Sequence, residues 1–236
     1  MPPILHYSEP HTGRDLPAAA VELPGDPLAA SRVIHFHEPL QGYAVGSSVS
    51  ADADLLIAAF PWVELGVVEA GELHLQGDGF DLRLNAGDCF VVPLGATLRW
   101  HHRGQLRLLF MAFPGLGDRA GMPAAPLKID LSQALPASNP PVAEVLLTAT
   151  PRAWSETLFS AANLRIGLWQ CEAYARKQVE PGYSELMFIL EGSVSLTTPQ
   201  GERHHVRAGE TVVVPRGATN AWESAETVRK VFCILA

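Results

Sequence analysis

The chain has 236 residues, of which 47% are apolar, and a formal net charge of −8 at pH 7. This length allows two folded domains of ordinary size, and the acidic balance argues against a nucleic acid or an anionic membrane as a partner. Neither a secretory signal nor an apolar run long enough to cross a bilayer is recognised, and the three cysteines are widely spaced. We therefore expect a cytoplasmic protein with buried, reduced thiols.

Many short strands are predicted, beginning after a Pro-rich N-terminal extension at residues 1–30. Apolar alternation indicates strands at residues 73–75, 194–196 and 228–232, with turns at residues 77–79, 199–201 and 216–217. A stretch rich in Pro, Ala and Gly at residues 114–141 is predicted to connect two domains, at residues 31–113 and 142–236. Short strands punctuated in this way are typical of an all-β sandwich or barrel.

Residues 86–100 and 208–222 are two versions of one sequence, AGDCFVVPLGATLRW and AGETVVVPRGATNAW. Upstream, the segment from Glu64 to Gly71 aligns with the segment from Glu185 to Gly192. A repeat of this length indicates two copies of one domain rather than a solenoid of small units. It also provides an internal comparison, because a chemically important residue found in only one copy indicates which copy has the function.

The spacing of the repeated residues resembles the two sequence motifs of the cupin superfamily. Those motifs run G-x5-H-x-H-x3-4-E-x6-G and G-x5-P-x-G-x2-H-x3-N, and the second copy matches them at Glu185, Gly192, Gly209, Pro215 and Gly217. The glycines allow tight turns where strands end, and the Pro-x-Gly corner redirects the chain. The resemblance implies an all-β protein with two tandem RmlC-like jelly-roll barrels in one chain, a bicupin.

The C-terminal half also resembles a narrower group of small cupins, through residues 167–171, 191–192, 219–223 and 226–232. This group is a domain-of-unknown-function family related to the cupins of ethanolamine utilisation and to the metal-binding ureidoglycine aminohydrolases. The resemblance is specific for the fold and leaves the function open, because this fold supports many chemistries.

A metal-binding cupin holds its ion with two histidines and a glutamate from the first motif and a histidine from the second. With the longer first-motif spacer, the corresponding residues of the second half are Gln178, Glu180, Glu185 and Asn220. The shorter spacer moves the two histidine positions to Val179 and Pro181. Because the first set offers only oxygen donors, it would favour a hard divalent cation of the Mn²⁺ type. The alternative is a polar pocket without a metal.

The first half keeps the glutamate as Glu64 but has Ile57, Ala59 and Leu98 at the histidine positions. One carboxylate among apolar side chains cannot hold a metal. We therefore expect Glu64 to be a hydrogen-bonded structural residue in a barrel whose interior is filled or apolar.

Several other residues of the second half are predicted to face its pocket, because strand alternation places them in phase with Glu185 or Asn220. The ligand-binding candidates are Arg176, Gln178, Tyr183, Met187, Asn220 and Trp222. An arginine, carboxylates and aromatic rings that face inward would suit a small polar metabolite. A packing role is the alternative for the two aromatic residues, because the first copy has Trp62 and Trp100 at the equivalent positions.

Charged residues elsewhere are given less functional weight. Lys230 is expected to pair with Glu223 or Glu226 on the surface. His35 and His37 would share one face of a strand, and a polar edge strand is the favoured interpretation over a metal-binding role. The remaining histidines of the repeat do not align with the pocket.

Two functions are compatible with these residues. The first is small-molecule binding in the C-terminal barrel. The second is a metal-dependent enzyme, in which Glu180 and Glu185 hold a Mn-type cation or act as acid and base on a small amino- or ureido-type metabolite. A helix-turn-helix segment is not recognised, so direct control of transcription is disfavoured. A homodimer is compatible with the sheet pairing of cupins.

Overall fold

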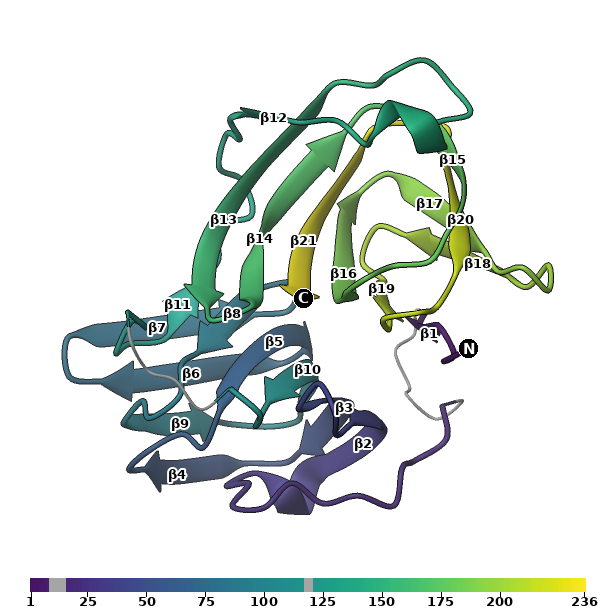
Figure 1. The fold of residues 1–236 in the computed structure, drawn as a ribbon. Helices are drawn as coiled ribbons and strands as arrows, with labels where there is room; N and C mark the ends of the chain where they lie inside the picture. Colours follow the sequence, from purple (N-terminus) through teal and green to yellow (C-terminus); the bar gives the residue numbers. More distant parts are fainter. Residues whose placement is uncertain (9–15, 117–120) are drawn as a thin grey trace. The chain divides into compact units, whose positions relative to one another are not determined.

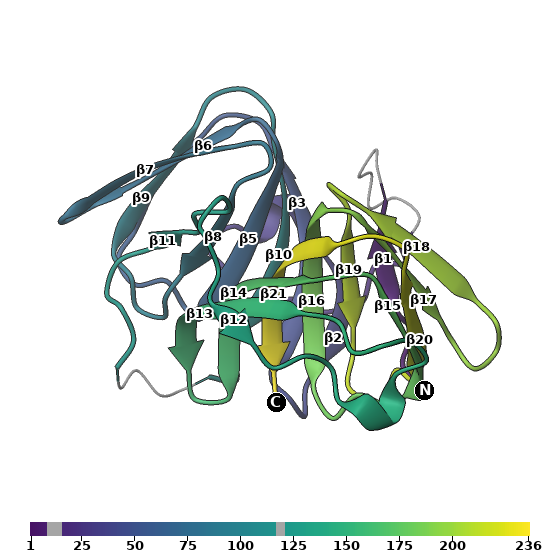
Figure 2. The ribbon, with the colours of Figure 1, turned by 90° about the horizontal axis from the view of Figure 1, so that it is seen from above.

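The structure is a computed structural model in which residues 1–8, 16–116 and 121–236 are described. Strands dominate it, as Figures 1 and 2 show, and the predicted fold class of two jelly-roll barrels in one chain is confirmed. The chain forms two compact units, Met1–Thr12 with Leu131–Ala236, and Gly13–Asp130. Among the described residues, helices that are long and apolar enough to cross a membrane are absent.

The N-terminal unit has a six-stranded sheet, β11-β8-β5-β10-β3-β2, and a four-stranded sheet, β4-β9-β6-β7. A short 3-10 helix, η1 (Ala29–Ser31), directly precedes β2. In chain order the strands are β2 (Arg32–Glu38), β3 (Tyr43–Ser50), β4 (Ala53–Ile57), β5 (Val63–Ala70), β6 (Glu72–Gly77), β7 (Phe80–Asn85), β8 (Cys89–Val92), β9 (Leu98–His102), β10 (Leu106–Phe113) and β11 (Leu127–Lys128).

The C-terminal unit repeats this plan with a seven-stranded sheet, β1-β19-β16-β21-β14-β13-β12, and a four-stranded sheet, β15-β20-β17-β18. Its strands are β1 (Leu5–Tyr7), β12 (Ala137–Ser138), β13 (Ala153–Ala161), β14 (Leu164–Cys171), β15 (Tyr174–Val179), β16 (Ser184–Glu191), β17 (Ser193–Thr197), β18 (Arg203–Arg207), β19 (Thr211–Val214), β20 (Asn220–Ser224) and β21 (Val228–Leu235), with a 3-10 helix η2 at Ala143–Val145. The strands predicted at residues 194–196 and 228–232 lie within β17 and β21.

The first strand of the chain belongs to the C-terminal unit. β1 pairs antiparallel with β19, with Leu5 opposite Val213. His6 Nε2 also lies 3.1 Å from Glu210 Oε2. An edge strand presents unpaired backbone groups to an added strand. Part of the N-terminal extension therefore extends a sheet of the C-terminal half.

The glycine that follows each motif glutamate has a backbone requirement that only glycine satisfies. Gly71 and Gly192 have φ values of 89° and 75°, in the left-handed region. A Cβ atom would lie 2.4 Å from the Gln105 carbonyl oxygen at Gly71 and 2.3 Å from the Thr227 carbonyl oxygen at Gly192. This close approach of two backbone segments explains why both copies keep the glycine.

The interior of the N-terminal barrel encloses a neutralised carboxylate. Glu64 of β5 is 1% exposed, and both of its oxygens accept hydrogen bonds from the Arg32 guanidinium of β2. Trp62 Nε1 donates to the same carboxylate at 2.8 Å, and the guanidinium lies 4.1 Å from the centre of the Phe110 ring. The neighbouring interior positions are apolar and buried, among them Leu98 and others of one core cluster. Glu64 is thus the structural residue that the sequence predicted.

We expect Arg32→Met to destabilise this barrel by about 3–5 kcal/mol, because it leaves a buried carboxylate without its cation. Hydrogen exchange of the β5 and β10 amides would measure the opening free energy of this unit by itself. The double variant Arg32→Met/Glu64→Gln should recover part of the loss, since it removes the Glu64 charge and keeps an acceptor for Trp62. The recovery is partial because the buried side chain of Asp26, 3.5 Å from the Arg32 guanidinium, still lacks its cation. Equal losses in the single and double variants would contradict this account.

Candidate functional site

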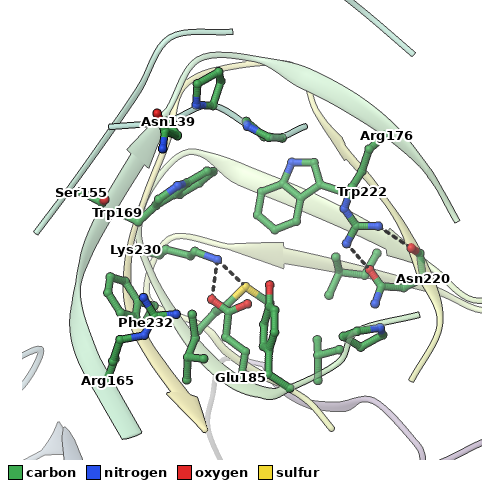
Figure 3. Close-up of a pocket in the computed structure, with 18 of the residues that line it drawn as sticks. Asn139, Ser155, Arg165, Trp169, Arg176, Glu185, Asn220, Trp222, Lys230 and Phe232 are labelled. Atoms are coloured by element: carbon green, nitrogen blue, oxygen red, sulfur yellow. Dashed lines mark hydrogen bonds and ion pairs between the residues drawn. The ribbon is translucent and has the colours of Figure 1, made fainter. Parts of the chain in front are cut away.

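The C-terminal barrel contains a cavity of about 360 Å³ between its two sheets (Figure 3). Its walls come from β13, β14, β16, β19 and β21 of the larger sheet and from β15, β17 and β20 of the smaller one, with residues 139–141 at one side. Polar and apolar side chains share the lining, as is typical of small-molecule sites.

A buried ion pair lies in this cavity. Lys230 of β21 donates a hydrogen bond to Glu185 Oε1 of β16 at 2.8 Å, and its Nζ lies 2.9 Å from Met187 Sδ. The Lys230 and Glu185 side chains are 8% and 12% exposed, so both charges are largely removed from water. The strands β16 and β21 are hydrogen-bonded neighbours, and side chains alternate between the two faces of a sheet. Lys230, Glu185 and Met187 therefore lie on the same face.

Aromatic rings surround the ammonium group. Lys230 Nζ lies 4.8 Å from the centre of the Trp169 ring and 5.3 Å from that of Trp222, both within cation–π range. Trp222 stacks on Tyr174 with centroids 5.5 Å apart, and its ring is nearly perpendicular to that of Trp169. Burial raises the pKa of Tyr174 well above its ordinary value, so this phenol stays neutral.

Arg176 and Asn220 form a second polar group in the cavity wall. The Arg176 guanidinium donates to the backbone oxygen of Asn220 and, at 2.8 Å, to its Oδ1 atom. Asn220 Nδ2 donates to the Ala218 carbonyl oxygen at 2.8 Å, which fixes the orientation of the amide. Burial lowers the pKa of Arg176 from its ordinary value. Arg176 nonetheless remains a cation at neutral pH, because an arginine is not deprotonated in proteins.

Arg165 of β14 and Tyr183 line the more exposed part of the cavity. Tyr183 is 40% exposed, and the negative charge of Glu185 raises its pKa to about 12. Arg165 is exposed, and it forms no hydrogen bond or ion pair with any residue in the described ranges. The cavity therefore has a cationic side chain available to a ligand.

Two of the predicted ligand positions lie outside the cavity. The pairing of β15 with β20 shifts register between Arg176 and Val179, and this irregularity changes which side chains face inward. Gln178 is exposed and donates to the Thr197 carbonyl oxygen at 2.9 Å, and Glu180 is exposed and absent from the lining. The prediction that both face the pocket is therefore corrected.

The remaining donors do not fit a divalent cation. Glu185 is bound to the Lys230 ammonium, which supplies the positive charge that a metal would otherwise provide. The Asn220 oxygens accept hydrogen bonds from Arg176. Within the described residues, no group of three or more His, Cys, Asp or Glu side chains is arranged to hold a metal. The set Gln178, Glu180, Glu185 and Asn220 is thus not brought together.

Six of the predicted pocket residues do line the cavity: Arg176, Tyr183, Glu185, Met187, Asn220 and Trp222. Sequence reasoning missed Arg165, Trp169 and Tyr174, and it placed Lys230 on the surface beside Glu223 or Glu226. The latter was wrong, because Lys230 is 7% exposed and pairs with Glu185. The repeat could have indicated that Lys230 is buried, because it aligns with Leu108 of the first copy, which is buried.

The histidines lie elsewhere. His35 is buried on the edge strand β2, with Nε2 2.9 Å from Ser47 Oγ, and burial lowers its pKa. The pairing of β2 with β3 shifts register between Ile34 and Phe36, so simple alternation does not relate His35 to His37. None of the histidines in the described ranges lines the C-terminal cavity.

Comparisons with known proteins agree with this architecture. The model of the EutQ-like cupin domain matches residues 160–232. Acetate kinase EutQ of Salmonella typhimurium strain LT2 is 33% identical over 61 residues, which cover 24% of this chain and 27% of that protein. The match therefore spans about a quarter of the length of this curated relative.

Solved structures extend the likeness to both halves. A protein with unknown function of the DUF861 family from Pseudomonas syringae pv. tomato str. DC3000 is 26% identical, with a TM-score of 0.89 over 99% of this chain and 100% of its own. A cupin 2 conserved barrel domain protein from Leptotrichia buccalis is 12% identical, with a TM-score of 0.62 over 87% of this chain and 88% of its own. The C-terminal half therefore matches the EutQ-like cupin domain, and the whole chain has the fold of two cupin barrels in tandem.

Proposed function

We propose that the C-terminal barrel binds a small organic anion, most simply a carboxylate, in the cavity around Lys230. Among the described residues, the lining contains three cationic side chains, Arg165, Arg176 and Lys230, and one carboxylate, Glu185. This local excess of positive charge, in a chain whose formal net charge is −8, is the observation that carries the proposal. Positive charge in a cavity with low-dielectric walls attracts anions more strongly than the same charge on an open surface.

The size and the walls of the cavity restrict the ligand further. A volume of about 360 Å³ is near the lower end for small-molecule sites, so the ligand is a small metabolite. Trp169, Trp222 and Phe232 offer apolar surface to its carbon skeleton. Arg165 offers a planar fork of N–H donors that matches the geometry of a carboxylate.

The alternative function, a metal-dependent enzyme for an amino- or ureido-type metabolite, has less support. Glu180 lies outside the cavity, so it cannot share a substrate with Glu185 as an acid–base pair. Glu185 is committed to an internal cation rather than to a cluster of metal donors. Anion binding requires no metal and uses the side chains that the cavity presents.

Matched pairs of acids and amides test the proposal. We expect lactate, glycolate, 2-hydroxyglutarate and phenyllactate to include at least one ligand, and the corresponding amide to bind more weakly, because only the acid can pair with a guanidinium. Arg165→Gln should weaken that acid by about tenfold, the loss of one charge-assisted hydrogen bond. Isothermal titration calorimetry would measure both differences.

Arg207→Gln is the matched control, because Arg207 is an exposed arginine of β18 in the same unit and lies outside the cavity. It makes the same change of charge and should leave the affinity within about twofold of that of the unaltered protein, since exposed charges at a distance are screened. Equal weakening by the two variants, or equal affinity for acid and amide, would refute anion binding at this site.

Removal of divalent cations is expected to have no effect. Protein dialysed against EDTA should keep its affinity for the acid and its thermal midpoint, because the donors that could hold an ion are bound to Lys230 and Arg176. Differential scanning calorimetry and titration of the same sample would measure both quantities. Loss of either one, with recovery on adding Mn²⁺, would restore the metal-dependent alternative.

A further inference from the structure

The cavity of the C-terminal barrel contains a primary amine in a chain that has few of them. The sequence contains three lysines, Lys128, Lys177 and Lys230. Lys128 pairs with Asp88 at 2.6 Å in the N-terminal unit, and Lys177 is exposed on β15. Lys230 alone among the three lines the cavity. A buried amine that faces a ligand cavity is a candidate nucleophile.

We propose that Lys230 forms an imine with the carbonyl carbon of a 2-oxo acid, with Glu185 moving the protons. This inference rests on the proposed function, since it assumes that the cavity binds a small acid. A 2-oxo acid combines the carboxylate that the cationic lining selects with an adjacent electrophilic carbonyl, and both fit within the same small space.

The two copies of the repeat provide the main argument. In the N-terminal barrel the equivalent carboxylate, Glu64, is neutralised by Arg32, which cannot act as a nucleophile because its guanidinium stays protonated. Arginine also suits a purely structural pairing with a carboxylate better than lysine does, because its planar fork binds both oxygens. The second barrel instead has a lysine, from another strand, and that lysine faces a cavity.

Glu185 is placed to act as the proton carrier. Its Oε1 accepts a hydrogen bond from Lys230 Nζ at 2.8 Å, within the reach required of a general base. The surroundings also suit the product, because an iminium nitrogen has the same positive charge as the ammonium. The Glu185 carboxylate and the Trp169 and Trp222 rings can therefore stabilise both species.

The step balances without an oxidant or a reductant. The ammonium gives a proton to Glu185, and the freed nitrogen lone pair forms a bond to the carbonyl carbon while the carbonyl π pair moves to oxygen. That oxygen receives the proton from Glu185, and a second proton follows from nitrogen by the same route. The carbon–oxygen bond then breaks, so that water leaves and a positively charged carbon–nitrogen double bond remains.

Reductive trapping tests the inference. The full-length protein is incubated with sodium cyanoborohydride and one of pyruvate, glyoxylate, 2-oxoglutarate or phenylpyruvate, and the modified lysine is mapped by peptide mass spectrometry. Each probe has its 2-hydroxy counterpart in the binding panel above. We expect a reduced adduct on Lys230, formed at least about tenfold faster than on Lys128 or Lys177, and no adduct with the hydroxy acids.

Three variants sharpen the result. Lys230→Arg keeps the cation, as Arg32 does in the first barrel, and should abolish the adduct at this position. Glu185→Gln should slow trapping by a factor on the order of 10² or more, the usual contribution of a general acid–base group. Lys177→Arg, outside the cavity, should leave the rate unchanged. Mapping on the unaltered protein decides the inference even if a cavity variant fails to fold.

The outcomes separate this inference from the proposed function. If a hydroxy acid and its 2-oxo counterpart bind but no adduct forms, or if the three lysines are modified equally, the imine is overturned and anion binding stands. If no acid of either panel binds, anion binding fails and the imine fails with it.

Discussion

A carboxylate buried inside a barrel is the constraint on which both halves of this protein depend. Glu64 and Glu185 occupy equivalent positions on equivalent strands, and both residues are buried. A buried charge without a partner would cost several kcal/mol, so each barrel must supply a cation. The first barrel supplies Arg32 from β2, and the second supplies Lys230 from β21.

The barrel that uses an arginine as the cation has a filled interior, and the barrel that uses a lysine has a cavity. The pairing of β2 with β3 and of β13 with β14 places Ser155 at the position equivalent to Arg32. A short serine there leaves space that a long guanidinium fills in the first barrel. In the second barrel Lys230 replaces an apolar Leu108 and reaches the carboxylate from the neighbouring strand, and the remaining space is a cavity lined by polar and aromatic groups.

The two copies thus use the same fold differently: one barrel has a filled interior and the other has a cavity. Both barrels keep the turn glycines, which the close approach of backbone segments requires. The first barrel closes its interior with apolar side chains around an Arg–Glu pair. The second retains a similar ion pair but leaves it next to a cavity of about 360 Å³, and in the proposed function this pair is part of the binding site.

The sequence by itself determined the fold and the duplication, and it indicated the half that contains the polar cavity. Glycine and proline spacing is a local property that survives in both copies, and the equivalence of Glu64 and Glu185 follows from alignment alone. Strand alternation from Glu185 and Asn220 also identified Tyr183, Met187 and Trp222 as cavity residues.

Only the tertiary structure decided which charges meet. Gln178 and Glu180 were placed in the pocket by the spacing of the cupin motif, and Gln178 also by strand alternation. The pairing of β15 with β20 is irregular between Arg176 and Val179, and neither side chain lines the cavity. Lys230 was assigned to nearby acidic residues in the sequence, whereas its partner Glu185 lies on a strand 45 residues away that the sheet brings alongside. Pairing between distant strands fixes these contacts, and a local sequence pattern does not contain that information.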